Sequence, residues 1–504
     1  MASAYYERLS AQDASFLPYE TRNNHMHITW TWIFDAGKLR TREGGIDVER
    51  IRAYVASRLH WIPRYRQRLS YIPVENDPIW IDDDRFNINY HVRHSCLPQP
   101  GDMSQLKELS ARVSSQQLDR GRPLWELWVV ESLEDGRFAI ISKTHHCMVD
   151  GVSTVDLMTV LLSRTPKHTV DDAPRWIPRP APGGNDLLRE ALLRRARTPI
   201  ELMDGIGNVV QELREVSSDI NSLSSVWNTI SAGLTRAPRT PLNAPIGPHR
   251  RIEWLSMDLE EVKEIKNRLG GTVNDVILAT VAGAVRAFFK YRQFFPDDLH
   301  FKVVVPVSVR SPEERGTLGN RASAWITELP IHIADPATRL ANVREATADL
   351  KESREALGAE LMIKVADFAG TNLMSLGVGV MNRLLRPYNL IVTNIPGSQD
   401  PFFLLEAQML EGYPLVPLFA NQGIGIALSS YVGRLYWGLN ADWDLLPDLQ
   451  TFAEALQRSF AELREAASAV KAPRARTPAR APRLKAPPRR RGRATDGAAM
   501  APAR

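Results

Sequence analysis

Two adjacent histidines precede an aspartate and a glycine in the segment THHCMVDG, residues 144–151. A neutral imidazole, with an ordinary pKa of about 6.5, can accept a proton near neutral pH and return it later. An alcohol is a poor nucleophile until a base removes its proton, and one histidine within reach of two substrates suffices for direct acyl transfer. The sequence contains no G-x-S-x-G motif that would supply an enzyme nucleophile. His145 and His146 are therefore candidates for acid–base chemistry, while Asp150 and Gly151 are candidates for shaping the loop.

Two other interpretations of this segment stay open from the residues alone. His145, His146 and Asp150 would bind zinc only if the loop bent them together, because the helical HExxH spacing is absent. Cys147 follows His146 directly and is poorly placed to reach the same ion. Alternatively, both histidines are ordinary loop residues without a chemical role. We predict no metal at this segment.

The segment is predicted to form a loop between a strand and a helix. Residues 124–133 and 137–144 predict a β-hairpin, and Asp135-Gly136 is a favourable pair for its tight turn. The second strand leads directly into the two histidines. A helix is predicted after Gly151, with Ser153 as its N-cap. Loops that a rigid scaffold holds in place often carry catalytic groups.

The rest of the chain predicts an α/β (α+β) protein with two similar halves. The first block, residues 1–165, contains a helix from Val48 to about Leu59. The second block, residues 251–470, alternates strands and helices in the same way. The expected elements of the second block are 258–269, 274–290, 300–309, 323–333, 337–357, 388–396, 402–410, 424–432, 434–442 and 445–467.

A Pro-bracketed, partly helical connector, residues 166–250, separates the two blocks. Within it, the segment DLLREALLRRAR (186–197) combines a short apolar patch with several arginines. Such a basic amphipathic segment can rest on an anionic membrane surface or pack against the protein's own body. The sequence leaves both possibilities open.

The net charge of +5 is concentrated at the C-terminal end. Residues 471–504 hold eleven Lys and Arg but one acidic residue, so they carry +10 and the remaining chain carries −5. This low-complexity Pro/Ala/Arg tail is predicted to be disordered. It is either a solvated solubility tail or a weak contact to acidic lipid or nucleic acid. Since the sequence pI of 9.1 describes the tail, no specific nucleic-acid binding is expected of the folded body.

Several features favour a cytoplasmic protein. Cys96 and Cys147 are the only cysteines and give no disulfide framework, which fits a reducing compartment. The N-terminus lacks the apolar core of a signal peptide. The most apolar long stretch, residues 365–382, contains Asp367 among other polar residues. A buried helix therefore fits this stretch better than a membrane span.

HHCMVDG resembles the HHxxxDG signature of the chloramphenicol-acetyltransferase-like, CoA-dependent acyltransferase superfamily. Further motifs occur in order along the chain, and as a set they look like the bacterial wax ester synthase/diacylglycerol acyltransferase family. These motifs are LSAQDASFL (9–17), HMHI (25–28), RPLWE (122–126), GGTVNDVILATVAGAVR (270–286), LGNRAS (318–323) followed by LP (329–330), VTNIPGS (392–398) and SYVGRLYWGLNAD (430–442). The resemblance spans residues 5–465, fits the connector only loosely and leaves out the tail.

The resemblance implies unequal roles for the residues of the loop. The second histidine of the family motif is the general base, so His146 would deprotonate the acceptor hydroxyl. His145 would support the loop or help to place the substrate. Asp150 would be mainly structural, and Gly151 would allow a sharp turn or a close backbone approach.

Three other family motifs carry over onto positions of this chain. Pro123-Leu124-Trp125 would lie on a strand near the acyl-binding region. Asn274-Asp275 matches the family's ND motif at a helix start, where it either caps the helix or takes a direct part in the site. Thr393-Asn394 departs from the serine usual in its motif, and Ser398 replaces a second proline. Those changes would alter the pocket wall and leave the chemistry intact.

The resemblance also implies the fold and the substrates. The fold would consist of two chloramphenicol-acetyltransferase-like subdomains, with the histidine loop near the middle of a channel between them. Long-chain acyl-CoA and a lipid alcohol, diacylglycerol or a fatty alcohol, would meet in that channel. The products would be triacylglycerol or a wax ester and free CoA. Acyl-CoA is then a substrate, no cofactor is expected, and the enzyme would work at the inner membrane or on lipid inclusions.

Two alternatives accompany this interpretation. The same motif occurs in polyketide-associated acyltransferases and in nonribosomal peptide condensation domains, which use carrier-protein thioesters. A non-catalytic protein of lipid surfaces that retains the fold would explain the basic segment and the tail. The intact His146 and Asp150 argue against the second alternative.

Overall fold

The computed structural model describes residues 5–148, 158–193, 236–295, 299–308, 322–357 and 388–470. All of them belong to one structural unit, Met1–Val470. The predicted helix at 365–382, the predicted N-cap Ser153 and the basic tail lie outside the described residues.

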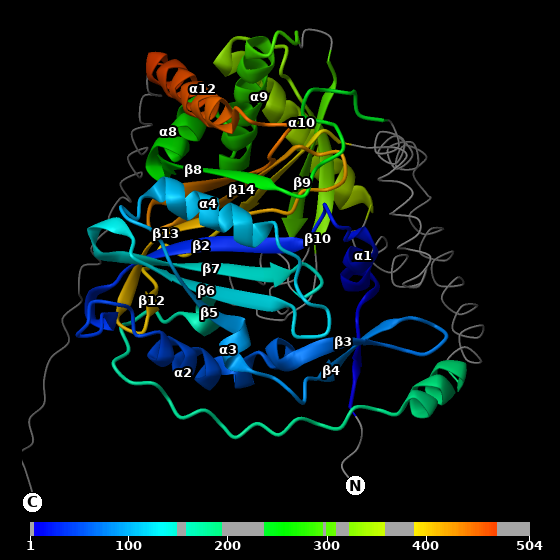
Figure 1. Ribbon diagram of the computed structural model, residues 1–504. Coiled ribbons are helices and arrows are strands. Elements are labelled where there is room, and N and C mark those ends of the chain that lie inside the picture. The colour runs from blue at the N-terminus through cyan, green and yellow to red at the C-terminus, as the bar shows by residue number, and fades with distance from the viewer. Residues whose placement is uncertain are drawn as a thin grey trace, which may run out of the picture. The chain divides into compact units, whose positions relative to one another are not determined.

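The first large sheet has six strands in the order β12-β13-β2-β7-β6-β5 (Figure 1). These strands are β2 His27–Asp35, β5 Val92–Cys96, β6 Trp125–Glu131, β7 Arg137–His145, β12 Phe403–Leu404 and β13 Ala407–Leu415. β2 lies beside β7 along its whole length, from the pair His27/His145 to the pair Asp35/Arg137. Because β2 and β7 are central and almost entirely buried, the end of β7 is fixed on both edges.

The predicted hairpin before the histidines is confirmed. β6 and β7 are antiparallel neighbours, and the turn between them contains Asp135 with φ 58° and Gly136 with φ 71°. Two consecutive positive φ angles match the right-handed twist of the flanking strands, and Asp-Gly pairs accept them at low cost. The turn thereby sets the register that carries residue 145 to the end of β7.

Helices border this sheet on both sides. Below it in Figure 1 lie α2 and α3, and α4 lies above β2, next to the edge strand of the other sheet. The helices of this half are α1 Ala11–Tyr19, α2 Val48–Arg58, α3 Ile88–His91 and α4 Met103–Ser114. α4 begins at a capping box in which Asp102 and Gln105 satisfy each other's backbone amides.

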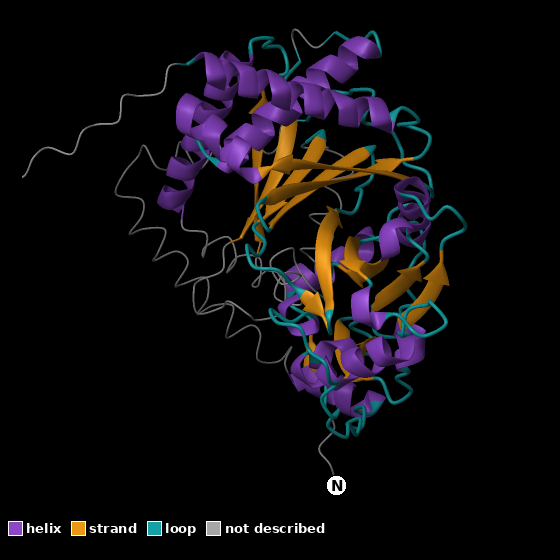
Figure 2. Cartoon of the chain, turned by 90° about the vertical axis from the view of Figure 1, so that its left-hand side faces the viewer, coloured by secondary structure: helices purple, strands orange, loops and turns teal. Residues whose placement is uncertain are grey.

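The second large sheet has the order β10-β9-β11-β14-β15-β8, and its helices lie on the side away from the first sheet (Figure 2). Its strands are β8 Arg250–Asp258, β9 Phe301–Ser308, β10 Ala322–Leu329, β11 Leu390–Ile395, β14 Ile424–Tyr431 and β15 Arg434–Asp442. Its helices are α8 Leu259–Leu269, α9 Val273–Tyr291, α10 Pro336–Leu357 and α12 Leu449–Ala469. The apolar stripe predicted on α12, including Leu449, Phe452 and Leu456, is buried as expected.

Two predicted strands of the second block were wrong in their bounds. The strand expected at 402–410 is two strands, β12 and β13, and both join the first sheet, where β13 pairs with β2. The strand expected at 323–333 ends at Leu329, because Pro330 has no amide hydrogen to continue the ladder. The chain of the second block therefore completes the sheet that carries the histidines, while the predicted subdomain boundaries stay predictions.

The two large sheets touch through β13. The rings of Tyr413 and Trp254 stack with centroids 4.7 Å apart, and the Tyr436 hydroxyl donates to the Leu410 carbonyl at 3.1 Å. At Gly438 a Cβ atom would lie 1.7 Å from the Pro414 carbonyl oxygen, so only glycine permits this approach. Strand β13 thus couples the histidine sheet to the second half.

A small third sheet, in the order β1-β4-β3, supports the start of the connector. Its strands are β1 Glu7–Arg8, β3 Gln67–Tyr71 and β4 Pro78–Asp82. Residues 184–193 are helical, and Leu187 and Ala191 are buried there against Ile79 and Ile81. For the described part of the 186–197 segment, packing on the protein's own body is therefore confirmed, and residues 194–197 lie outside the described part.

Among the described helices, none is by itself long and apolar enough to cross a membrane, and a single pair, α8 with α9, meets that test only when joined across a bend of 95°.

Candidate functional site

The backbone of the histidine pair is held from two neighbouring segments. The His145 amide donates to the Leu124 carbonyl at 3.0 Å, and the His146 amide donates to the Met26 carbonyl at 2.7 Å. The Met148 amide then closes a turn on the His145 carbonyl at 3.0 Å. The backbone that carries the two imidazoles is therefore fixed at the end of β7.

His145 is completely buried, with a hydrogen bond at one ring nitrogen and a carboxylate near the other. Its Nδ1 accepts a hydrogen bond of 3.1 Å from the Cys147 amide, so the ring proton resides on Nε2. That Nε2 lies 3.7 Å from Oε2 of Glu20. Burial lowers the pKa of His145, and the Glu20 carboxylate opposes that change only in part. His145 is therefore a neutral ring with its proton on Nε2.

Glu20 is a buried carboxylate at the centre of a small ionic cluster. Arg120 donates from Nε to its Oε2 at 2.8 Å, and a terminal nitrogen of the same guanidinium lies 2.6 Å from that oxygen. Nε2 of His27 lies 3.4 Å from the other oxygen. Burial favours the neutral acid, but the ring nitrogens of His145 and His27 that face the carboxylate outweigh burial and lower the pKa of Glu20. Glu20 therefore stays ionised.

His27 and His25 extend this cluster along β2 toward α4. Burial lowers the pKa of His27 to about 3, and burial also lowers the pKa of His25. Nε2 of His25 donates to the Ser115 carbonyl at 3.0 Å, and the rings of His25 and His27 stack at 5.4 Å. These buried neutral rings fill space and orient Glu20.

His146 has a different environment. Its ring is only half-buried, and it stacks on the ring of Phe16 with centroids 4.1 Å apart and planes 13° apart. A flat stack of this kind limits rotation of the imidazole. Of the two histidines, His146 is the one that a substrate can reach without opening the core.

The remaining residues of the loop divide into two groups. Asp150 and Gly151 lie outside the described residues. Cys147 is buried, and burial raises the pKa of its thiol well above the usual range, which disfavours the thiolate that a nucleophile or metal ligand needs. Within the described ranges, no three His, Cys, Asp or Glu side chains are grouped to hold a metal ion.

Pro123-Leu124-Trp125 lies at the start of β6, directly beside the histidines. Trp125 is fully buried, donates from its indole nitrogen to the Tyr65 carbonyl at 2.8 Å, and stacks on His91 at 4.5 Å. Leu124 is also fully buried and supplies the carbonyl that holds His145. The motif thus supports the histidine strand, and its expected contact with the acyl chain stays a prediction.

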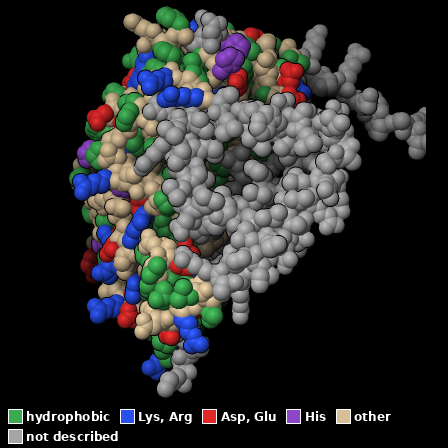
Figure 3. Space-filling view, turned by 90° about the vertical axis from the view of Figure 1, so that its right-hand side faces the viewer, with side chains coloured by type: hydrophobic (Ala, Val, Ile, Leu, Met, Phe, Trp, Pro, Cys, Tyr) green, Lys and Arg blue, Asp and Glu red, His purple; other side chains and the backbone are tan. Residues whose placement is uncertain are grey.

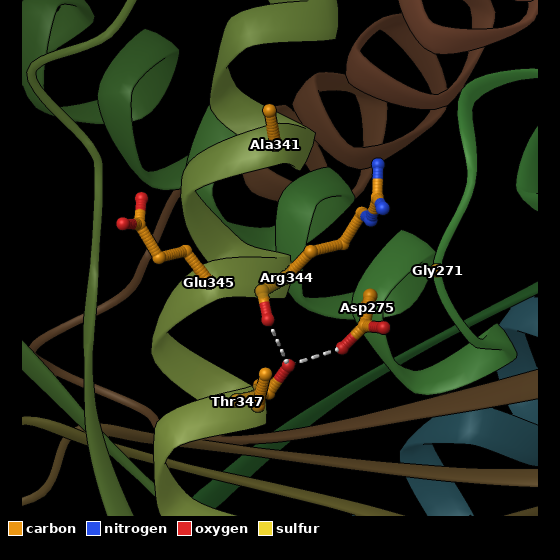
Figure 4. A pocket seen from close by; sticks show the side chains of 7 residues that line it. Gly271, Asp275, Ala341, Arg344, Glu345 and Thr347 are labelled. Carbon is orange, nitrogen blue, oxygen red and sulfur yellow. Dashed lines mark hydrogen bonds between the residues drawn. The ribbon is translucent and has the colours of Figure 1, made fainter.

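The ND motif lies at the start of α9 in the second half. The N-cap is Thr272, and Asp275 completes a capping box with it, accepting from the Thr272 amide at 2.7 Å. The other oxygen of Asp275 accepts from the Thr347 hydroxyl of α10 at 2.8 Å (Figure 4). Asp275 therefore has the capping role, although the N-cap itself is neither of the two residues expected there.

Asn274 has a separate partner. Its side-chain oxygen accepts from the side-chain nitrogen of Asn394 at 2.8 Å, so the ND motif and the VTN motif of β11 meet. An open depression of about 440 Å³ lies next to Asp275 and is lined by Gly271, Arg344 and Glu345, among others (Figure 4). A direct role of Asn274 or Asn394 in the site stays a prediction.

Sequence reasoning missed the side chains that hold the histidines: Phe16, Glu20, His27 and Arg120. Phe16 lies in the family motif LSAQDASFL, but the motif alone predicts no role for it. The alternation of His25 and His27 was a usable signal, because residues two apart on a strand share a face. What the alternation does not reveal is that β2 pairs with β7, which places His27 beside His145.

Comparisons with known proteins find similar proteins over most of the chain. A family model described as wax ester synthase/diacylglycerol acyltransferase catalytic domain matches residues 9–277, and one described as WS/DGAT C-terminal domain matches residues 318–464. A putative diacylglycerol O-acyltransferase of Mycobacterium tuberculosis strain CDC 1551 is 32% identical over 472 residues, covering 92% of this chain and 91% of that protein.

Solved structures show the same fold. The wax ester synthase/diacylglycerol acyltransferase from Marinobacter aquaeolei VT8 has a TM-score of 0.67 at 23% identity, covering 92% of this chain and all of that one. The first condensation domain of the CDA synthetase has a TM-score of 0.55 at 15% identity, covering 93% of this chain and 98% of that one. The predicted α/β (α+β) fold with two acyltransferase-like subdomains is confirmed, while the channel between them stays a prediction.

Proposed function

Since this chain belongs to the wax ester synthase/diacylglycerol acyltransferase family, we propose that it moves a long-chain acyl group from acyl-CoA to a lipid hydroxyl. It is an O-acyltransferase, and the acceptor in the proposal is diacylglycerol, a fatty alcohol or both. The observation that carries the proposal is the division of the histidine pair: His145 is sealed in the core, and His146 is held half-buried beyond the end of β7.

The proposed mechanism needs one base and no covalent enzyme intermediate. His146 removes the proton of the acceptor hydroxyl while that oxygen attacks the thioester carbonyl. The tetrahedral intermediate then expels CoA, the C–S bond breaks, and the imidazolium returns its proton to the thiolate. The products are an ester and CoA thiol, so acyl-CoA is a substrate and no cofactor takes part. A general base of this kind contributes typically about 10²–10⁴-fold.

Two features support direct transfer. The neighbouring Cys147 is buried with a raised thiol pKa, so it is a poor nucleophile. The His145 ring faces Glu20 and the Cys147 amide, so it has no access to a substrate in this arrangement. His146 is then left as the base, with His145 as its support.

The test is an acceptor panel with one long-chain acyl-CoA. Purified protein is given a diacylglycerol, a long-chain alcohol or glycerol, and CoA thiol release is measured while products are separated by thin-layer chromatography. Ester formation with the diacylglycerol or the alcohol is expected. A parallel arm supplies the same acyl group on a carrier protein. Transfer from the carrier alone, or no transfer to any acceptor, would overturn the proposal.

We also propose that the enzyme is cytoplasmic and binds the inner membrane or lipid inclusions peripherally. Exposed apolar side chains lie at the turn after β3 and at the end of the 184–193 helix: Tyr71, Val74, Leu192 and Leu193. Figure 3 shows hydrophobic side chains near the lower end of the molecule, with basic and acidic side chains beside them. Exposed apolar side chains of this kind can insert into the boundary of a lipid surface.

A flotation assay with vesicles of anionic phospholipid tests this placement. The double substitution V74S/L192S is expected to reduce the fraction of protein bound to vesicles several-fold, because each apolar side chain would bury its area in the lipid. Phe295 is an exposed apolar residue in the other half and serves as the matched control, so F295S should float like the unchanged protein. Equal flotation of all three proteins would contradict the proposed surface.

A further inference from the structure

Helix α1 and the residue that follows it carry groups which the proposed mechanism has not used. Phe16 stacks on His146, and Glu20 faces His145. From this juxtaposition we infer that the segment Ala11–Glu20 is the positioning element of the active centre, with Phe16 orienting the base and Glu20 fixing the histidine beside it. The inference rests on His146 being the base of the proposed function.

Glu20 acts through a chain of named contacts. Its Oε2 lies 3.7 Å from the protonated Nε2 of His145, and Nδ1 of the same ring accepts from the Cys147 amide at 3.1 Å. The carboxylate thus selects the tautomer that leaves Nδ1 free to accept. If His145 turned or changed tautomer, the Cys147 amide would lose its acceptor inside the core, at a cost of about 1–3 kcal/mol. Glu20 thereby fixes the backbone turn from which His146 projects.

Phe16 acts on the base directly. A centroid distance of 4.1 Å with nearly parallel planes leaves the imidazole little freedom to rotate. Phe16 is itself half-buried against the core of the first sheet. A base must reach the acceptor hydroxyl within hydrogen-bonding distance, and a misplacement of 1 Å costs about 10²-fold in rate. The stack is suited to holding His146 within that tolerance.

Arg120 ties the helix to the sheet. In addition to its two contacts with the Glu20 carboxylate, it donates to the Leu17 carbonyl at 2.8 Å, at the C-terminal end of α1. A cation at this end satisfies an otherwise open carbonyl and complements the helix dipole. One guanidinium therefore holds both the helix end and the carboxylate, so α1 cannot shift without disturbing the pair of histidines.

The test compares kcat and KM of E20Q, E20A and F16L with those of the unchanged enzyme. E20Q keeps the shape and hydrogen-bonding oxygen of Glu20 but removes its charge, and a drop in kcat of about 10-fold is expected. E20A removes the contact altogether, and a drop of about 10²-fold is expected. F16L retains apolar bulk without the flat stack and should lose about 10-fold. In all three, KM for acyl-CoA should change less than threefold, because positioning acts on the reaction step.

A pH profile separates positioning from a general structural defect. The groups that face Glu20 are Arg120 from the loop before β6, His27 from β2 and His145 from β7. Lys143 on β7 and His25 before β2 lie farther away and also interact with its charge. Removing the negative charge of Glu20 disfavours protonation of the nearby histidine that acts as the base. The acid limb of kcat/KM in E20Q should therefore move to lower pH. A loss that came only from partial unfolding would leave the limb in place.

The matched control is D82N. Asp82 is another buried carboxylate paired with an arginine, Arg179, but it lies on β4 in the small sheet. D82N should lose stability, while its kcat per folded molecule and its pH profile stay those of the unchanged enzyme. If E20Q and F16L behave like D82N, the inference is wrong.

His146→Ala in the same assay distinguishes the two proposals. An active H146A would overturn the proposed base itself. An inactive H146A together with unchanged kcat and pH profiles in E20Q and F16L would overturn only the positioning role of α1. If His146 is the base and α1 positions it, the double variant E20Q/H146A should lose little more activity than H146A alone, because Glu20 acts through the same base.

Discussion

Replacing Lys143 by methionine is expected to destabilise the sheet that carries the histidines. Lys143 lies on β7, two residues before His145, and its side chain is completely buried. Its ammonium donates to the Val113 carbonyl at 3.1 Å and the Gln116 carbonyl at 3.0 Å, and lies 3.4 Å from the Glu126 carboxylate. K143M keeps the stem but removes the charge and both hydrogen bonds.

The size of the effect follows from these contacts. Breaking a buried ion pair by removing one partner costs about 3–5 kcal/mol, because the other charge is left in the core. Glu126 keeps an arginine, Arg93, at 2.9 Å and the Trp128 indole at 3.0 Å, so the cost should lie at the lower end. We expect a loss of about 3 kcal/mol in the free energy of unfolding.

Urea unfolding followed by tryptophan fluorescence measures this loss. With a slope of about 3 kcal/mol per molar urea, the midpoint should fall by about 1 M. The double variant K143M/E126Q leaves no unpaired carboxylate, so its cost should be smaller than the sum of the two single costs by more than about 1 kcal/mol. An unchanged midpoint in K143M, or strictly additive costs, would refute the reasoning.

Two further predictions concern the same architecture. Burial lowers the pKa of His91 to about 4, so the unfolded chain binds one more proton than the folded chain between pH 6.5 and 4. The free energy of unfolding should therefore fall by about 3 kcal/mol as the pH drops through that window. The urea midpoint should depend less steeply on pH in H91F, and an identical slope would contradict the assignment. G438A should prevent accumulation of folded protein, since its Cβ would lie 1.7 Å from the Pro414 carbonyl oxygen where the two sheets meet. The control G433A, at a hairpin turn with φ 74° and open space, should cost only about 1 kcal/mol by thermal unfolding, and equal losses would contradict the close-approach argument.

Local patterns predicted the elements that depend on local chemistry. Asp135-Gly136 specified the hairpin turn, and the apolar spacing of residues 445–467 specified the buried face of α12. The assignment of β13 could not be predicted in this way, because its partner β2 comes from the other end of the chain. Strand pairing over such separations depends on the tertiary fold, which periodicity does not encode.

The candidate site divides in the same manner. His146 and His145 follow from the motif, and the structure adds that one ring is reachable while the other is sealed. Phe16 lies in the motif LSAQDASFL, which gave it no role, and Glu20 carries no local signature because a lone glutamate after a short helix is ordinary in sequence. Their contacts with the histidines depend on the tertiary fold, in which Arg120, from the loop before β6, binds both the Leu17 carbonyl and the Glu20 carboxylate. Only the tertiary structure brings these residues to the base.

The most direct test of direct transfer by His146 is CoA thiol release by H146A and H145A beside the unchanged enzyme, at saturating acyl-CoA and diacylglycerol. H146A should lose about 10²–10⁴-fold in kcat while remaining folded. H145A should lose less per folded molecule, because its ring acts through its neighbour. Mass spectrometry of the enzyme with acyl-CoA alone should show no acylated residue. Near-normal turnover in H146A, or a stoichiometric acyl-enzyme, would contradict the account.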